Sequence, residues 1–178
     1  MKSSMQMRGI AAAAALAVLA GCSGGGGTVG GETRAKAVRP DHDMVQAIRQ
    51  AGASTASSVE VQPLRDPSVD GFLKQAADFE AAHNYNDAVG AVDQALKLAP
   101  DAPEILQLKA ELLVGLRRYA DAEALARKSF ELGPRLGSLC ARNWQTVVET
   151  RRAAKDEASA ESAKAQLAAC KVPPRQRL

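Results

Sequence analysis

Apolar residues recur every three or four positions between residues 67 and 132, with polar residues between them. This spacing is typical of amphipathic helices, because one face of a helix repeats every 3.6 residues. Breaks in the pattern divide the stretch into four predicted helices, at residues 67–82, 85–98, 103–115 and 119–132. Pro100 and Pro134 follow the second and the fourth, where a proline cannot continue a helix. The pattern therefore predicts two consecutive helical hairpins.

The two hairpins repeat each other at a period of 34 residues. The pairs that coincide at this shift are Ala76 and Ala110, Tyr85 and Tyr119, Asp87 and Asp121, Ala88 and Ala122, Leu98 and Leu132, and Pro100 and Pro134. A fixed period of this length marks a stacked helical repeat. The paired alanines are expected where the two helices of a hairpin approach most closely, because only small residues permit that approach.

This repeat resembles the tetratricopeptide repeat family. The positions that carry the resemblance read Phe72, Ala76, Phe79, Ala88, Val92, Ala95 and Pro100 in the first copy, and Leu106, Ala110, Leu113, Ala122, Ala126, Ser129 and Pro134 in the second. Ser129 departs from the alanine of the family pattern. The resemblance implies an all-α fold, a short tetratricopeptide-type α-solenoid, and a role in binding other proteins. An unrelated bundle of helical hairpins is the alternative.

A third, divergent hairpin is predicted at residues 136–151 and 156–170. Trp144 stands where a third repeat would have a small residue, so we interpret this hairpin as a cap, with Trp144 covering the exposed end of the stack. The helical domain is then expected to span residues 67–170. Residues 171–178 are expected to form a disordered tail.

The N-terminus has the pattern of a bacterial signal segment. Lys2 and Arg8 precede an apolar run at residues 10–20, which is shorter than the ~20 residues that span a bilayer. The run ends in Leu19-Ala20-Gly21-Cys22, which resembles the lipoprotein processing box. That resemblance implies a signal peptide at residues 1–21, cleavage before Cys22 and a covalent lipid on Cys22. Ser23 in place of Asp favours the outer membrane. An ordinary secretory signal is the alternative.

Between the anchor and the repeats lie two further segments. Residues 22–40 are rich in glycine and are expected to form a tether. Residues 41–66 are expected to contain a short helix at 41–51, followed by an irregular linker. The pattern leaves open whether that helix docks against the first repeat or stays mobile.

Lipidation of Cys22 would leave two cysteines, and these form a plausible pair. In an antiparallel hairpin that turns near Lys155, Cys140 and Cys170 stand opposite each other. The oxidising periplasm would allow a disulfide to form between them. Two buried free thiols are the alternative.

Charge and composition exclude several kinds of function. The formal net charge is +3, but removal of Lys2 and Arg8 with the signal peptide leaves 21 basic and 20 acidic residues. Aromatic residues make up only 3%, so we expect no nucleic-acid surface. His42 and His83 are isolated, and the sequence contains no pattern of a catalytic or metal site. We expect no enzyme, no cofactor other than the lipid, and no small-molecule substrate.

The family resemblance implies a peptide groove lined by the first helix of each pair. Its positions here are Asp70, Leu73, Ala77, Glu80, Glu104, Gln107, Glu111 and Val114. Four of these are acidic and none is basic, so a basic or apolar peptide is the expected ligand. The alternative is that the acidic side chains are only solvated.

These features together predict an outer-membrane lipoprotein that faces the periplasm and serves as an adaptor between proteins. It is similar to the tight-adherence pilus lipoproteins and the pilotins, which implies a role in the assembly of a pilus or a secretion system. The alternative is a non-catalytic regulator that docks on an enzyme of cell-wall synthesis or remodelling.

Overall fold

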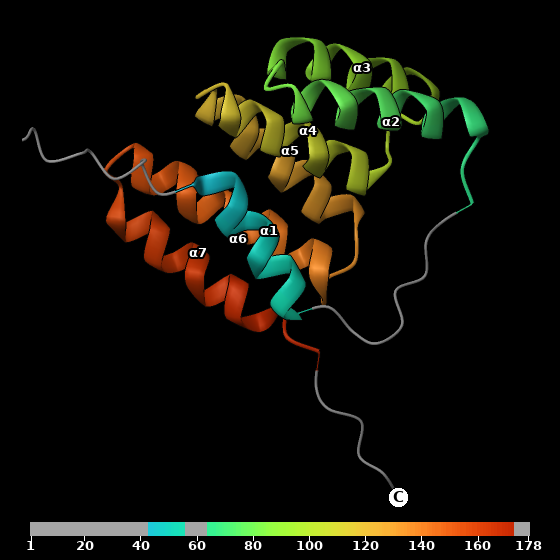
Figure 1. Ribbon diagram of the computed structural model, residues 1–178. Helices are drawn as coiled ribbons and strands as arrows, with labels where there is room; N and C mark the ends of the chain where they lie inside the picture. Colours follow the sequence, from blue (N-terminus) through green and yellow to red (C-terminus); the bar gives the residue numbers. More distant parts are fainter. Residues whose placement is uncertain (1–42, 56–63, 173–178) are drawn as a thin grey trace, which may run out of the picture. The chain divides into compact units, whose positions relative to one another are not determined.

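The computed structural model describes residues 43–55 and 64–172, which form seven helices and no strand (Figure 1). The all-α class predicted from the sequence is confirmed. The signal peptide at residues 1–21, Cys22 and the glycine-rich tether lie outside the described residues. So do residues 56–63 of the predicted linker and residues 173–178 of the predicted tail. None of the described helices is long and apolar enough to cross a membrane.

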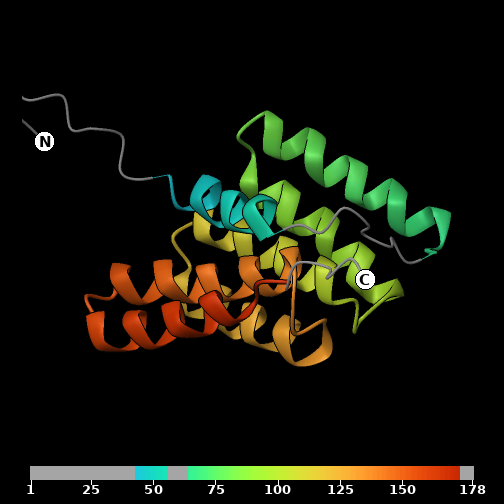
Figure 2. The same cartoon turned by 90° about the horizontal axis from the view of Figure 1, so that it is seen from below.

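Three helical hairpins follow one another along the chain. Their helices are α2 (Pro67–Ala81) and α3 (Tyr85–Leu98), α4 (Pro103–Gly115) and α5 (Tyr119–Leu132), and α6 (Ser138–Ala153) and α7 (Glu157–Ala169). The two helices of each hairpin pack side by side. Successive hairpins stack, through α3 on α4 and through α5 on α6 (Figures 1 and 2). This stack is the short helical solenoid that the repeat predicts.

The repeated small residues lie where the helices of a pair meet. Ala76, Ala88, Ala110 and Ala122 are all buried, with at most 2% of their surface exposed. Ser129, the departure from the family pattern, is also fully buried. Its hydroxyl donates a 2.7 Å hydrogen bond to the carbonyl oxygen of Pro103 at the start of α4. The polar side chain is therefore satisfied inside the core, as a buried hydroxyl must be.

Larger apolar side chains fill the space between the hairpins. Val92 of α3 packs in one cluster with Ile105 and Leu112 of α4, and these three have at most 1% of their surface exposed. Burial of each such side chain contributes about 1.5–3 kcal/mol. The apolar faces of α3 and α4 thus hold the first hairpin on the second.

The third hairpin is closed by a disulfide. The sulfur atoms of Cys140 and Cys170 are bonded, and the two Cα atoms are 5.6 Å apart. Beside them, the amide of Gly137 donates a 2.7 Å hydrogen bond to the carbonyl oxygen of Cys170. Gly137 has φ +84°, a left-handed conformation that glycine adopts without steric cost. The start of α6 is therefore tied to the end of α7.

Trp144 packs against α5, the last helix of the two regular repeats, so the third hairpin covers that end of the repeats as the sequence predicts. The ring of Trp144 lies against Phe130 of α5, with the ring centroids 5.0 Å apart in an edge-to-face arrangement. It therefore faces the second hairpin rather than solvent beyond the third.

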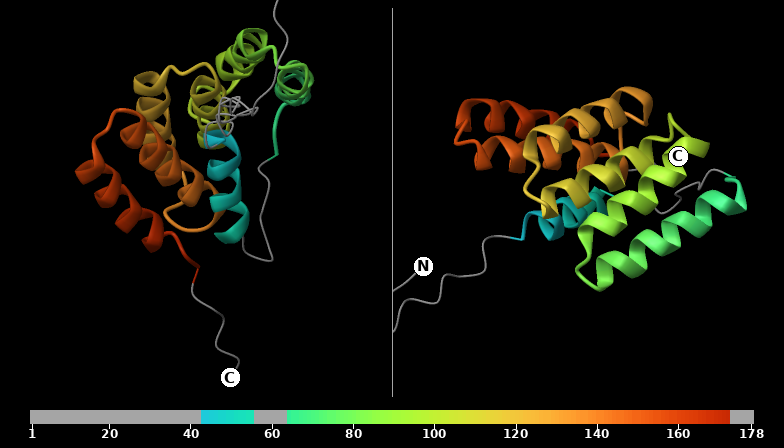
Figure 3. Two further views of the ribbon diagram at one scale, coloured as in Figure 1. Left: turned by 60° about the vertical axis from the view of Figure 1, so that its left-hand side comes forward. Right: turned by 90° about the horizontal axis from the view of Figure 1, so that it is seen from above.

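Helix α1 (Met44–Thr55) begins three residues later than the predicted helix at 41–51 and ends four residues later. It packs mainly against α6 and α4 (Figure 3), and its Arg49 also forms an ion pair with Glu80 of α2 in the first hairpin. Ile48 is fully buried, in one cluster with Leu113 and Val114 of α4. At Gly52 a Cβ atom would lie 2.6 Å from the side chain of Arg142, so glycine permits the close contact between α1 and α6.

We predict that replacing Cys140 and Cys170 together by alanine lowers the free energy of unfolding by about 3–4 kcal/mol, because the bond closes a loop of roughly 30 residues in the unfolded chain. Urea unfolding of both proteins measures the difference. A reducing agent should destabilise the wild type by a similar amount and leave the double variant unchanged. Equal unfolding midpoints for the oxidised wild type and the variant would contradict the prediction.

Candidate functional site

The eight residues of the predicted peptide groove lie in very different environments. From the most exposed to the most buried they are Asp70 and Ala77, then Leu73, Glu80 and Glu104, and finally Gln107, Glu111 and Val114. The last three have at most 3% of their surface exposed. They do not line an open groove, because α1 and α6 pack over this part of α4. The sequence could not show this, since α1 lies outside the repeats.

Glu111 is the centre of an ion-pair network beneath α1. Its side chain is fully buried. One carboxylate oxygen accepts a 2.7 Å hydrogen bond from Nε of Arg142 on α6, and the other accepts a 3.0 Å bond from Nε of Arg49 on α1. Arg49 also donates to Glu80 of α2 at 2.8 Å. Burial of the Arg49 guanidinium acts to lower its pKa, but the charges and hydrogen bonds of Glu111 and Glu80 together outweigh burial and raise the pKa above its ordinary value.

Gln107 extends the network into the core. Its side-chain amide donates to Glu111 at 3.0 Å and to the hydroxyl of Thr146 on α6 at 2.9 Å. Thr146 in turn donates to the carbonyl oxygen of Arg142. Helices α1, α4 and α6 are thus joined by polar contacts as well as by their apolar faces.

The remaining acidic groove residues also have partners within the chain. Arg65, just before α2, lies 3.7 Å from the carboxylate of Asp70 and 3.3 Å from that of Glu104. Each of the four acidic positions is therefore paired with at least one arginine of this protein. The groove is expected from the sequence to take a basic or apolar peptide, and in the structure Arg49, Arg65 and apolar residues of α1 contact these positions instead.

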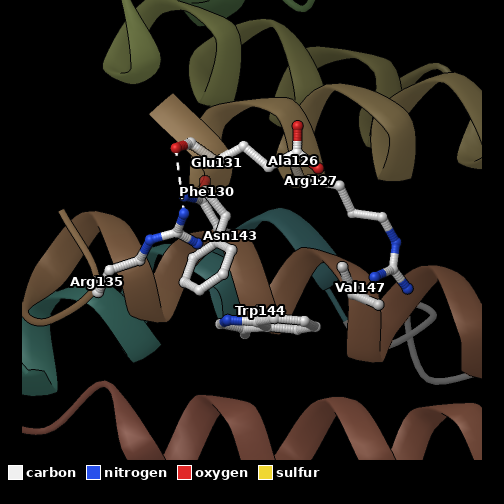
Figure 4. Close-up of a pocket in the computed structure, with 8 residues that line it drawn as sticks. All are labelled: Ala126, Arg127, Phe130, Glu131, Arg135, Asn143, Trp144 and Val147. Carbon is white, nitrogen blue, oxygen red and sulfur yellow. Dashed lines mark hydrogen bonds between the residues drawn. The ribbon is translucent and has the colours of Figure 1, made fainter. Parts of the chain in front are cut away.

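A second site lies between α5 and α6, on residues that the groove prediction does not include. It is a cavity of about 300 Å³ (Figure 4). We call it the α5–α6 cavity. Its lining residues are Ala126, Arg127, Phe130, Glu131, Arg135, Asn143, Trp144 and Val147.

Two aromatic rings and two arginines form most of this cavity. The guanidinium carbon of Arg135 lies 4.2 Å from the centre of the Phe130 ring, and that of Arg127 lies 5.7 Å from the centre of the Trp144 ring. Figure 4 shows the two guanidinium groups on opposite sides of Phe130, with Trp144 on the side of α7. Cation–π contacts of this kind are worth about 0.5–1 kcal/mol at exposed sites.

Glu123 of α5 holds Arg127 in place and links α5 to α6. Its carboxylate accepts hydrogen bonds from Arg127 at 2.9 Å and from Arg151 of α6 at 2.6 Å. Burial of this carboxyl acts to raise its pKa, but the hydrogen bonds from Arg151 and Arg127 and their charges outweigh it. The pKa of Glu123 therefore lies below its ordinary value.

Among residues 43–55 and 64–172, no three His, Cys, Asp or Glu side chains gather closely enough to hold a metal ion. Sequence analysis did not place Phe130, Arg135 or Asn143 in a site. Its one signal was Trp144, a large ring at a position where the repeat calls for a small residue.

The fold resembles that of a known bacterial domain. The solved structure of the globular C-terminal domain of P. aeruginosa LpoP matches this chain with a TM-score of 0.50 and 23% sequence identity. The match covers 57% of this chain and 99% of the LpoP chain. At this identity the likeness shows a shared fold. No protein-family model matches the sequence, and no curated protein matches it.

We predict that Glu111→Gln lowers the free energy of unfolding by about 2–3 kcal/mol, because it leaves Arg49 and Arg142 without their shared buried carboxylate. The matched control is Glu80→Gln, which changes a partly exposed partner of Arg49 and should cost less than about 1 kcal/mol. Urea unfolding compares the two. Equal losses of unfolding free energy in the two variants would contradict the prediction that the buried Glu111 contributes more than the partly exposed Glu80.

The lowered pKa of Glu123 makes a prediction about pH. A carboxyl whose pKa is lower in the folded state stabilises the fold above its unfolded pKa, and this contribution is lost as pH falls through the folded pKa. Glu123→Gln should therefore be less stable than the wild type at pH 7, by about 1 kcal/mol for a partly exposed pair. The difference in stability should begin to shrink as pH falls to ~4.3, the ordinary glutamate pKa, and should vanish only below the lower pKa of the folded state. A difference that stays constant from pH 7 down to the onset of acid unfolding would contradict the prediction.

Proposed function

We propose that this chain is a lipoprotein of the outer membrane that faces the periplasm and docks on an enzyme of cell-wall synthesis or remodelling. It regulates that enzyme without catalysing a reaction itself. A lipid on Cys22 anchors the chain, and residues 22–40 carry the helical domain away from the membrane. The observation that carries this proposal is the fold shared with the globular domain of P. aeruginosa LpoP, nearly the whole of which is matched.

The structure supports a docking role that does not use the predicted groove. The buried side of α4 is filled by α1, and the acidic residues there are paired with Arg49, Arg65 and Arg142. A partner peptide could enter only by displacing that helix and its buried ion pairs. The α5–α6 cavity needs no such displacement, because it opens between two helices that are already in contact.

The likeness to the LpoP domain favours a cell-wall enzyme over the pilus and secretion components implied by the sequence resemblance. Stacked helical hairpins present extended surfaces to partner proteins, and this use of the fold is common to both contexts. Identification of the partner protein therefore decides between a cell-wall enzyme and a pilus or secretion component.

The test is crosslinking in cells followed by capture of the lipidated protein, with Cys22→Ser as the control. We expect a cell-wall synthase or hydrolase among the captured proteins. The Cys22→Ser chain should lose its membrane attachment and recover at least about tenfold less of that enzyme, because anchoring raises the local concentration of both partners. The same soluble variant, added to the purified enzyme, should still bind it and change its rate. Capture of secretin or pilus components instead would overturn the proposal.

A further inference from the structure

The α5–α6 cavity contains a buried amide that no residue of the described chain satisfies. Asn143 has 1% of its surface exposed, and neither its side-chain oxygen nor its side-chain nitrogen has a hydrogen-bond partner. Most buried polar atoms in folded proteins are hydrogen-bonded, and each one that is not costs stability. Asn143 therefore leaves both an acceptor and a donor unused at the wall of a cavity.

The charges around the cavity are unequal. Arg127 is held by the carboxylate of Glu123. Arg135 lies over Phe130 and donates only to the backbone carbonyl of Glu131, at 3.3 Å. Within the part of the chain that the structure describes, Arg135 has no carboxylate partner. Its guanidinium can therefore donate hydrogen bonds to a carboxylate of a ligand. Such charge-assisted pairs are about twice as strong as neutral hydrogen bonds.

Apart from the exposed acidic residue Glu131, the rest of the lining is apolar. Phe130, Trp144, Ala126 and Val147 surround a volume of about 300 Å³, which is at the lower end of the range of ligand sites and admits one large side chain. The edge-to-face rings of Phe130 and Trp144 favour an apolar or aromatic group between the two helices. A ligand of this small site would therefore carry an apolar group, an amide and a carboxylate.

We propose that the α5–α6 cavity binds a short acidic peptide segment of a partner protein. An apolar side chain of that segment packs on Phe130 and Trp144, a peptide group pairs with the amide of Asn143, and an Asp or Glu side chain pairs with Arg135. A peptide bond offers one donor and one acceptor, which is the pattern that an asparagine side chain complements. This inference rests on the proposed docking function and names the contact through which docking occurs.

The amide of Asn143 has almost no exposed surface, so a peptide group reaches it only as the neighbouring side chains move aside. Arg135 is exposed and is placed to move in this way. Rotamer changes of this kind are common at interfaces whose backbone stays fixed.

Selection of peptides from a random displayed library on the full-length Cys22→Ser chain tests the proposal. We expect the selected sequences to place Asp or Glu within a few residues of an aromatic residue or Leu. Trp144 is the only tryptophan of the chain, so binding of a synthetic selected peptide should change its fluorescence. Replacement of the acidic residue of that peptide by its amide should weaken binding about tenfold.

Two variants test the residues themselves. Arg135→Glu should weaken binding of the selected peptide by tenfold or more, and Asn143→Leu should weaken it by about tenfold. Asn143→Leu should not lower the thermal midpoint, because it removes an unsatisfied buried amide; Asn143→Ala serves if leucine does not fit. The control is Arg152→Glu, an exposed charge reversal on α6 away from the cavity, which should leave binding unchanged.

Selection of basic peptides, failure to enrich any sequence, or binding that is indifferent to both variants would overturn the proposal. The outcome separates it from the proposed function. If a cell-wall enzyme is captured equally well by the Arg135→Glu protein, the cavity is not the docking site although the function stands. If another partner is captured and Arg135→Glu abolishes its capture, the cavity binds a protein but the proposed context is wrong.

Discussion

The arrangement of this domain depends on the ion pairs and hydrogen bonds of the buried Glu111 carboxylate. A fully buried negative charge is tolerated only where it is paired and hydrogen-bonded, and here two arginines and a glutamine amide surround it. The two arginines belong to α1 and α6, whereas Glu111 belongs to α4. One charge thus requires three helices to assemble together, and the position of α1 follows from its arginine as much as from its apolar face.

This requirement explains how so short a stack can be a stable domain. Two regular repeats are fewer than the usual three or more, because each hairpin leaves an apolar face that its neighbour must cover. Here the third hairpin departs from the repeat pattern and is closed by a disulfide. Helix α1 covers the apolar side of α4 and α6 that a longer solenoid would leave to its ligand.

Much of the fold could be predicted because its determinants are local. Periodicity, the paired alanines and the prolines placed four helices within a residue of their observed ends, and the turn near Lys155 set Cys140 opposite Cys170, as they are in the structure. The site could not be predicted in the same way. Arg49 and Glu111 are 62 positions apart, so the sequence did not show that they form a pair. The acidic positions therefore indicated a ligand groove, although arginines of the same chain contact them. The unsatisfied amide of Asn143 exists only through tertiary packing, and no sequence pattern marks it.

The attachment of α1 also has a mechanical meaning. The chain enters the described domain through this helix, and α1 packs mainly on the second and third hairpins, with an ion pair from Arg49 to Glu80 of the first one. Tension arriving along the chain from its N-terminal side would therefore bear first on the packing of α1 against α6 and on the ion pairs of Arg49 with Glu111 and Glu80. The hairpin that receives this load is the one whose two helices are covalently joined. A pull would thus be opposed mainly at the hairpin that the disulfide holds together.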